Sequence, residues 1–131
     1  MTGLDTNVLV RLFAQDDLLQ SMKADEIMGS LSAEAPGWVS IAVLMELVWV
    51  LSYTYRARRA EVASILNRLA SNDQIVIEQV DTVRKALRLF DDGKAGFADC
   101  LIACLASAAG CTRTLTFDRR AARDAGMQLI G

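Results

Sequence analysis

The sequence contains no histidine and only three cysteines, which restricts the metal sites that it can build. A structural zinc site uses four cysteine or histidine ligands, and the chain cannot supply them. Cys100 and Cys104 share one face of an expected helix, and together with Cys111 they are interpreted as small core residues. An odd number of cysteines without a secretion signal also does not suggest a disulfide framework.

The chain also has little proline and no linker. It contains one proline among 131 residues, 53% of the residues are apolar, and no internal repeat or low-complexity segment is present. This composition argues against a disordered chain. A chain of this length buries about two-thirds of its unfolded surface. We therefore expect a single domain over residues 1–131 with one hydrophobic core.

An excess of positive charge, which is common in nucleic-acid-binding proteins, is missing as well. The formal net charge is −2. If four carboxylates share one metal pocket, the rest of the chain carries +2, and two bound divalent cations neutralise the pocket. The overall charge therefore does not exclude an RNA or DNA substrate.

No signal peptide is recognised at the start, which lacks a basic segment and a long apolar run. One apolar stretch, residues 35–55, has the length of a membrane span and a single charge, Glu46. A carboxylate at the centre of a span costs about 2.5–3.5 kcal/mol, and Pro36-Gly37 interrupts the beginning of the stretch. We expect a cytoplasmic protein without a membrane segment.

Hydrophobic periodicity predicts alternating strands and helices. The expected strands are 3–4, 38–39, 74–77, 112–117 and 128–130, and the expected helices are 7–14, 18–31, 41–55, 59–71, 82–91, 97–109 and 119–124. Asp16-Asp17, Ser40 and Asp81 are suitable N-caps, and Gly110 is a suitable helix end. This alternation is typical of a parallel sheet with helices on both faces.

Four acidic residues occupy positions that such a sheet brings to one edge. Asp5 and Asp118 directly follow expected strands, and Glu46 and Asp99 lie in the early turns of expected helices. Ligands of open α/β sheets bind outside the carboxyl ends of the strands. Each acid also has an ordinary local role, as a helix cap or, for Glu46, as the partner of an arginine. Their joint occurrence favours a shared site.

Carboxylates gathered in one cleft repel each other unless positive charge is present. Without histidine, the natural partner is a hard divalent cation, Mg²⁺ or Mn²⁺, as one or two ions. A pair of such ions about 3.5–4 Å apart can activate water and orient a phosphate. The pattern predicts metal-dependent phosphodiester hydrolysis with Asp5, Glu46, Asp99 and Asp118 as metal ligands and catalytic residues.

Four segments, taken in order, resemble the motifs of PIN-domain nucleases. They are 4–11 (Leu-Asp-Thr-Asn-Val-Leu-Val-Arg), Glu46 in a helix after Val39-Ser40, 97–103 (Phe-Ala-Asp-Cys-Leu-Ile-Ala) and 115–120 (Leu-Thr-Phe-Asp-Arg-Arg). The resemblance covers nearly the whole chain. Within the family, the chain most resembles the VapC-type toxins of bacterial toxin–antitoxin pairs.

The resemblance implies a three-layer α/β/α sandwich with a mostly parallel central sheet. It implies an endoribonuclease that uses Mg²⁺ or Mn²⁺, forms a homodimer and is inhibited by a cognate antitoxin protein. Asp5, Glu46 and Asp99 would be the main metal ligands, and Asp118 would complete the site. Thr6 and Thr116 would support the carboxylates through their hydroxyls, with Asn7 on the same turn as a further candidate.

Several arginine and aromatic residues are candidates for contacts to RNA or to partner proteins. Arg119 and Arg120 lie beside Asp118, and Arg11 lies near Asp5, so these arginines are candidates for gripping phosphates, although most arginine clusters only solvate a surface. The aromatic residues Trp49, Tyr53 and Tyr55 exceed what one core face needs. They suit a dimer or antitoxin interface, unless flanking helices cover them.

Three other functions remain alternatives to RNA cleavage. A catalytically silent PIN-fold binding module would be expected to lack one of the four acids, and a nuclease acting on DNA would use the same ligands. A receiver-like phosphoacceptor domain needs an acidic pair and a late lysine, whereas the last lysine, Lys94, stands in an unsuitable context. Asp5-Thr6-Asn7 does not match the Asp-x-Asp motif of a phosphatase.

Overall fold

The computed structural model describes all residues, 1–131, and divides the chain into two compact units, Met1–Glu78 and Gln79–Gly131. The single domain expected over residues 1–131 stays a prediction, and each unit is described separately. Both units combine helices with parallel strands, as expected for a PIN-like α/β fold. None of the helices combines the length and the apolar character that crossing a membrane requires.

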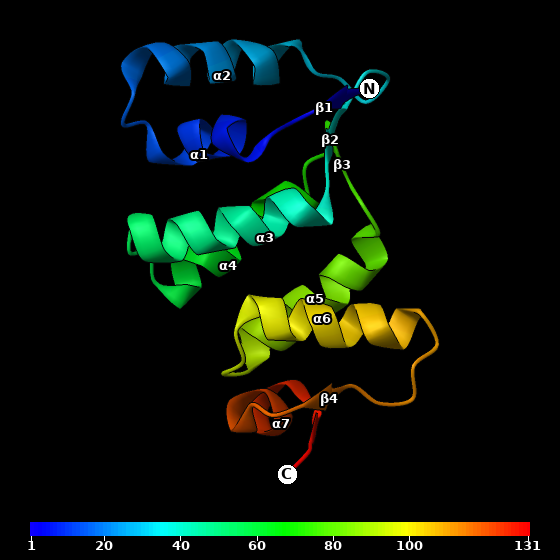
Figure 1. Ribbon diagram of the computed structural model, residues 1–131. Coiled ribbons are helices and arrows are strands. Elements are labelled where there is room, and N and C mark those ends of the chain that lie inside the picture. Colours follow the sequence, from blue (N-terminus) through cyan, green and yellow to red (C-terminus); the bar gives the residue numbers. More distant parts are fainter. The chain divides into compact units, whose positions relative to one another are not determined.

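The first unit is built on three parallel strands in the order β1-β2-β3. They are β1 (Thr2–Gly3), β2 (Gly37–Val39) and β3 (Ile75–Ile77), and β2 pairs with both neighbours. In Figure 1 the three strands lie side by side, and the helices of this unit extend from one end of them. Because all strands run the same way, the residues after Gly3, Val39 and Ile77 share one edge of the sheet.

Five helical segments complete this unit: α1 (Thr6–Ala14), α2 (Leu18–Ser30), α3 (Ile41–Trp49), a π-helical turn η1 (Val50–Thr54) and α4 (Arg59–Ala70). The expected caps of α2 and α3 are confirmed, because Asp17 accepts from Gln20 N and Ser40 accepts from Val43 N. The single helix expected over 41–55 is wrong in its second half, where the chain widens into η1. Such π turns need no proline or glycine, so the sequence pattern does not reveal them.

Gly37 allows β1 and β2 to pack closely. A Cβ atom at this position would lie 2.8 Å from Leu4 Cδ1 and 3.0 Å from Leu31 Cδ1, below normal contact distance. Leu4 and Leu31 are both buried, so neither can turn out to solvent. The glycine therefore lets both leucines cover β2 where β1 leads into Asp5.

The second unit contains α5 (Val80–Asp92), α6 (Phe97–Ala108), β4 (Leu115–Thr116), α7 (Arg119–Ala125) and β5 (Gln128–Leu129). Helices α5 and α6 lie side by side in Figure 1, and Phe90 meets Phe97 edge-on with ring centroids 5.8 Å apart. Strands β4 and β5 pair in parallel. Gly110, with φ of +97°, ends the helical region as expected.

Three local predictions in or near the second unit are wrong. Asp81 does not cap α5; it lies within the first turn, and Gln79 in a left-handed conformation occupies the cap position. The strand expected over 112–117 shortens to Leu115–Thr116, which pair with Gln128–Leu129, and the Thr114 carbonyl adds one hydrogen bond from Gln128 N. Cys111 is exposed and Cys104 is half-buried, so only Cys100 is a fully buried core residue, and all three thiols are free.

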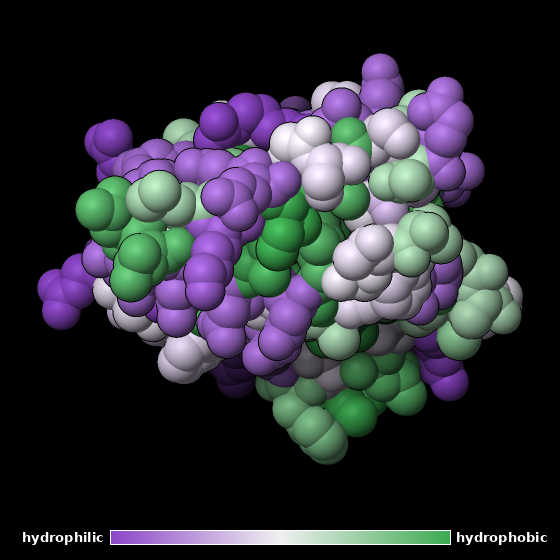
Figure 2. All heavy atoms as spheres, turned by 90° about the horizontal axis from the view of Figure 1, so that it is seen from above, coloured by the Kyte–Doolittle hydropathy of each residue, from purple (hydrophilic) through white to green (hydrophobic).

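Several large apolar side chains remain on the surface, among them a group on α2 and an aromatic pair on α3 and η1. Figure 2, viewed from the α2 side, shows hydrophobic atoms gathered in groups between hydrophilic ones. Leu18, Leu19 and Met22 of α2 are exposed, as are Trp49 and Tyr53, whose ring centroids lie 5.4 Å apart. Flanking helices therefore do not cover this aromatic pair.

Candidate active site

Asp5 stands where β1 turns into α1. It is the N-cap of α1, and its Oδ1 accepts a 2.7 Å hydrogen bond from Thr6 N. An extended backbone at this position (φ −81°, ψ 162°) turns the exposed carboxylate toward the helix end. The cap thereby holds Asp5 at the carboxyl edge of the sheet.

Glu46 lies in α3, and Thr6 connects it to Asp5. The Thr6 hydroxyl donates a 3.0 Å hydrogen bond to Glu46 Oε1, while the Thr6 backbone donates to Asp5. Thr6 is only 5% exposed, so its hydroxyl has a fixed environment. Two of the predicted ligands are therefore held by one buried residue, and no lysine or arginine forms an ion pair with either of them.

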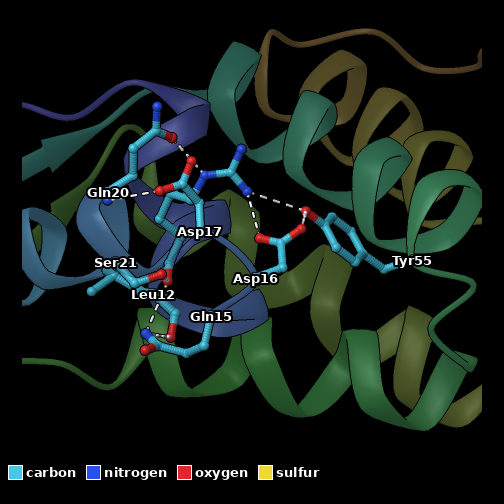
Figure 3. A network of polar contacts seen from close by, with 8 residues as sticks. Leu12, Gln15, Asp16, Asp17, Gln20, Ser21 and Tyr55 are labelled. Carbon is cyan, nitrogen blue, oxygen red and sulfur yellow. Dashed lines mark hydrogen bonds and ion pairs between the residues drawn. The ribbon is translucent and has the colours of Figure 1, made fainter.

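Asn7 and Arg11 lie further along α1. Asn7 is exposed in the first turn and is not the N-cap. Arg11 Nη1 donates to Asp16 Oδ1 at 2.6 Å and to the Tyr55 hydroxyl at 3.3 Å, while Arg11 Nε donates to Gln20 at 2.7 Å. Figure 3 shows this network between α1, the turn before α2 and the end of η1. The guanidinium is thus already paired within the protein.

The same network shifts the pKa values of its members. The Tyr55 hydroxyl donates to Asp16 Oδ2 at 2.6 Å, which holds the pKa of Asp16 below its usual value and raises the pKa of Tyr55. The hydrogen bond to Tyr55 and the charge of Asp16 raise the pKa of Arg11. These shifts favour the ion pair over its neutral forms across the middle of the pH range.

In the second unit, Asp99 lies in the first turn of α6 and is partly exposed. No basic residue forms an ion pair with it. The N-terminal end of a helix carries partial positive charge, which stabilises a carboxylate in its first turn. Asp99 is therefore positioned by the start of α6 at Gly96.

Asp118 follows β4 after one intervening residue, Phe117, and is the N-cap of α7. Its Oδ1 accepts from Arg120 N at 2.7 Å and from Ala121 N at 3.2 Å. The Thr116 hydroxyl accepts from Asp118 N at 3.0 Å, so it contacts the backbone of Asp118 and not its carboxylate. The structure thus supports Thr116 as a residue that shapes this turn.

The arginines of α7 differ in their pairing. Arg119 and Arg120 are exposed and form no ion pair, whereas Arg123 binds Asp124 through two hydrogen bonds of 2.9 Å and lowers the pKa of that carboxyl. Arg119 and Arg120 therefore keep their charge available for an anion beside Asp118.

The chain was also compared with known proteins. A family model of the PIN domain matches residues 4–126. The chain belongs to the PIN-domain family. A VapC ribonuclease from Aquifex aeolicus (strain VF5) is 25% identical over 122 residues, which cover 92% of this chain and 89% of that protein.

The donor atoms of this PIN domain fit a hard divalent cation. Asp5, Glu46, Asp99 and Asp118 provide carboxylate oxygens, the ligands that Mg²⁺ and Mn²⁺ prefer. Within the first unit, Thr6 brings Asp5 and Glu46 together without a neutralising cation of the protein. No group of three or more potential ligands is found in the structure, so the meeting of all four acids stays a prediction.

Sequence reasoning missed one acidic residue of the first unit, Glu78. Its Oε1 accepts a 2.9 Å hydrogen bond from Ile41 N, the first residue of α3. Glu78 directly follows β3, whereas Asp5 and Asp118 each follow their strand after one intervening residue. An acid immediately after the expected strand 74–77 is the signal that could have drawn attention to it.

Proposed function

We propose that this PIN domain is a metal-dependent endoribonuclease and the toxin of a toxin–antitoxin pair. The observation that carries the proposal is the arrangement around Thr6, which donates hydrogen bonds to Asp5 and Glu46. Neither carboxylate forms an ion pair with a basic residue. The likeness to a VapC ribonuclease over most of both chains supports RNA as the substrate class.

The metal would be held by the carboxylates of Asp5, Glu46, Asp99 and Asp118, as one or two Mg²⁺ or Mn²⁺ ions. Bound there, such a cation would activate water and neutralise negative charge on the scissile phosphate. The protein's own contribution is positional: Thr6 orients Glu46, and the helix ends of α1, α6 and α7 hold the three aspartates.

The reaction proposed is hydrolysis of an RNA phosphodiester. Water attacks the phosphorus in line, the bond from phosphorus to one ribose oxygen breaks, and that oxygen takes up a proton. No covalent intermediate with the protein is required. Arg119 and Arg120 would hold neighbouring phosphates, because they are exposed and form no ion pair.

The proposal includes partners and a location. A cognate antitoxin protein would inhibit the enzyme, a homodimer would be its working form, and the cytoplasm its location. The exposed pair Trp49 and Tyr53 suits one of these protein contacts, because exposed aromatic groups are enriched at interfaces.

The proposal is tested with the purified full chain and a random-sequence single-stranded RNA, with DNA of the same length in parallel. We expect RNA cleavage in Mg²⁺ or Mn²⁺ and none in excess chelator. The cleavage rate should fall at least 100-fold in Asp5→Asn, Glu46→Gln and Asp99→Asn, on the order of the effect of removing an essential electrostatic contact. Glu26→Gln, a change on the exposed surface of α2, is the matched control and should keep full activity.

Four results would overturn the proposal. Full cleavage in chelator or in Asp5→Asn would remove the metal mechanism. Cleavage of DNA alone would make the protein a deoxyribonuclease, and metal binding without cleavage of either substrate would make it a binding module.

A further inference from the structure

Glu78 is fixed at the carboxyl edge of the sheet by its backbone. Its N–H donates a 2.9 Å hydrogen bond to Val39 O, which continues the ladder between β3 and β2 by one residue. The residue is partly buried. Its side chain therefore starts from a defined point beside the N-terminus of α3.

The Glu78 side chain caps that N-terminus together with Ser40. Glu78 Oε1 accepts from Ile41 N at 2.9 Å, and Ser40 Oγ accepts from Val43 N at 3.1 Å. The first N–H groups of a helix have no partner inside the helix, and the helix end favours negative charge. Ser40 is a local cap, whereas Glu78 comes from another strand, 37 residues away in sequence.

This cap fixes where α3 begins, and α3 carries Glu46. Burial of Leu44 and Leu47 holds the helix against the core, while the two caps set its start at the sheet edge. Glu46 itself is exposed, and its carboxylate accepts a hydrogen bond from Thr6. Glu78, which follows β3, contacts the start of α3, the helix after β2. Glu46 of α3 in turn contacts Thr6, which begins the helix after β1.

We propose that Glu78 is a positioning residue that sets Glu46, through α3, for metal binding beside Asp5. The inference rests on the proposed function. Glu78 acts as a hydrogen-bond acceptor at Ile41 N and does not itself contact metal or RNA.

The test compares two substitutions of nearly equal size in the full chain. Glu78→Gln keeps an oxygen that accepts from Ile41 N, and Glu78→Met does not. Mn²⁺ affinity is measured by calorimetry, with Glu26→Met as the control on the exposed surface of α2. Loss of a group bonded directly to a ligand costs about 10–100-fold in metal affinity. Glu78 is not bonded to a metal ligand and acts on Glu46 only through α3. We therefore expect the Mn²⁺ affinity of Glu78→Met to fall about 3- to 10-fold and that of Glu78→Gln to stay within twofold of wild type.

A second measurement does not depend on the Met variant being folded. In wild type and in Glu78→Gln, the Ile41 amide proton should exchange slowly with solvent, because a side-chain oxygen at position 78 accepts its hydrogen bond. Rapid exchange of the Ile41 amide in wild type overturns the proposal. Equal Mn²⁺ affinity of Glu78→Met and wild type also overturns it, as does an equal loss in Gln and Met, since charge and not hydrogen bonding would then matter.

Failure of the proposed function can be distinguished from failure of the positioning role by Mn²⁺ binding to the wild-type chain and to Asp5→Asn. Absence of Mn²⁺ binding by wild type, or unchanged binding by Asp5→Asn, contradicts the metal site itself. A wild-type chain that binds Mn²⁺ through Asp5, with an indifferent Glu78, contradicts only the positioning role.

Discussion

The hydroxyl of Thr6 donates a 3.0 Å hydrogen bond to Glu46 Oε1 across 40 residues of sequence. Thr6 begins α1, and its backbone N–H also binds the Asp5 carboxylate. A single buried side chain thus sets the relation between two of the predicted metal ligands. Supports of this kind orient a ligand without touching the metal.

The first prediction concerns the Thr6 hydroxyl. Thr6→Val has nearly the same shape but cannot donate to Glu46, whereas Thr6→Ser keeps the donor. We expect Thr6→Val to weaken Mn²⁺ binding about 10-fold and to change the free energy of unfolding by about 1 kcal/mol or less. Thr6→Ser should bind Mn²⁺ almost as wild type does. Calorimetry and urea titration measure both effects, and equal affinity in the Val variant would contradict the role of the hydroxyl.

The second prediction uses the different pairing of the α7 arginines. Arg119→Ala and Arg120→Ala should each weaken RNA binding and lower the slope of log affinity against log salt by about 0.7–1, as expected when one phosphate contact is lost. Arg123→Ala is the matched control, because Asp124 already pairs with Arg123. Filter binding at several salt concentrations gives the slopes. A larger change in Arg123→Ala than in the other two would argue against the assignment.

The third prediction is a pH dependence of stability from the network in Figure 3. The pKa of Asp16 is lowered from its ordinary value of 3.8. The stability that Asp16 contributes is therefore present above pH 3.8 and is lost as the pH falls through the pKa of the folded state. The pKa of Tyr55 is raised from 10.0. The stability that Tyr55 contributes is therefore present below pH 10.0 and is lost as the pH rises through the pKa of the folded state.

The urea concentration at the midpoint of unfolding, measured at several pH values, tests this pH dependence. Wild type should exceed Asp16→Asn in stability between about pH 4 and pH 10, with the two converging at both ends. The chain offers Asp25→Asn on the exposed surface of α2 as a control without this network. A constant difference at every pH would show that the two titrations do not contribute.

The fourth prediction compares two glycines of the first unit. Gly37→Ala places a methyl group against buried Leu4 and Leu31, and overpacking of this kind costs about 1–3 kcal/mol. Gly29→Ala, near the end of α2, meets nothing within 4 Å, so we expect it to be neutral or stabilising by up to about 1 kcal/mol. Chemical denaturation of both variants measures the difference. Equal stability of the two would show that β1 and β2 can separate without cost.

Much of the local structure could be predicted from sequence because its causes are local. The caps at Asp17 and Ser40 and the helix end at Gly110 each depend on residues within one turn. The prediction failed at Asp81, where Gln79 instead takes a left-handed conformation at the cap. It also failed where α3 widens into η1, since nothing in residues 50–54 marks a π turn.

The sequence by itself determined the family and the ligand types available to it: four carboxylates without histidine, placed after expected strands and in early helix turns, predict an oxygen-ligand site in a PIN domain. Only the tertiary structure decided which side chains meet. Arg11, a candidate from sequence for binding RNA phosphates, is paired with Asp16 and Tyr55, while Glu78, which sequence reasoning missed, accepts a hydrogen bond from Ile41 N. The physical reason is distance along the chain, since periodicity and capping act within a turn, whereas these contacts arise only when strands and helices pack.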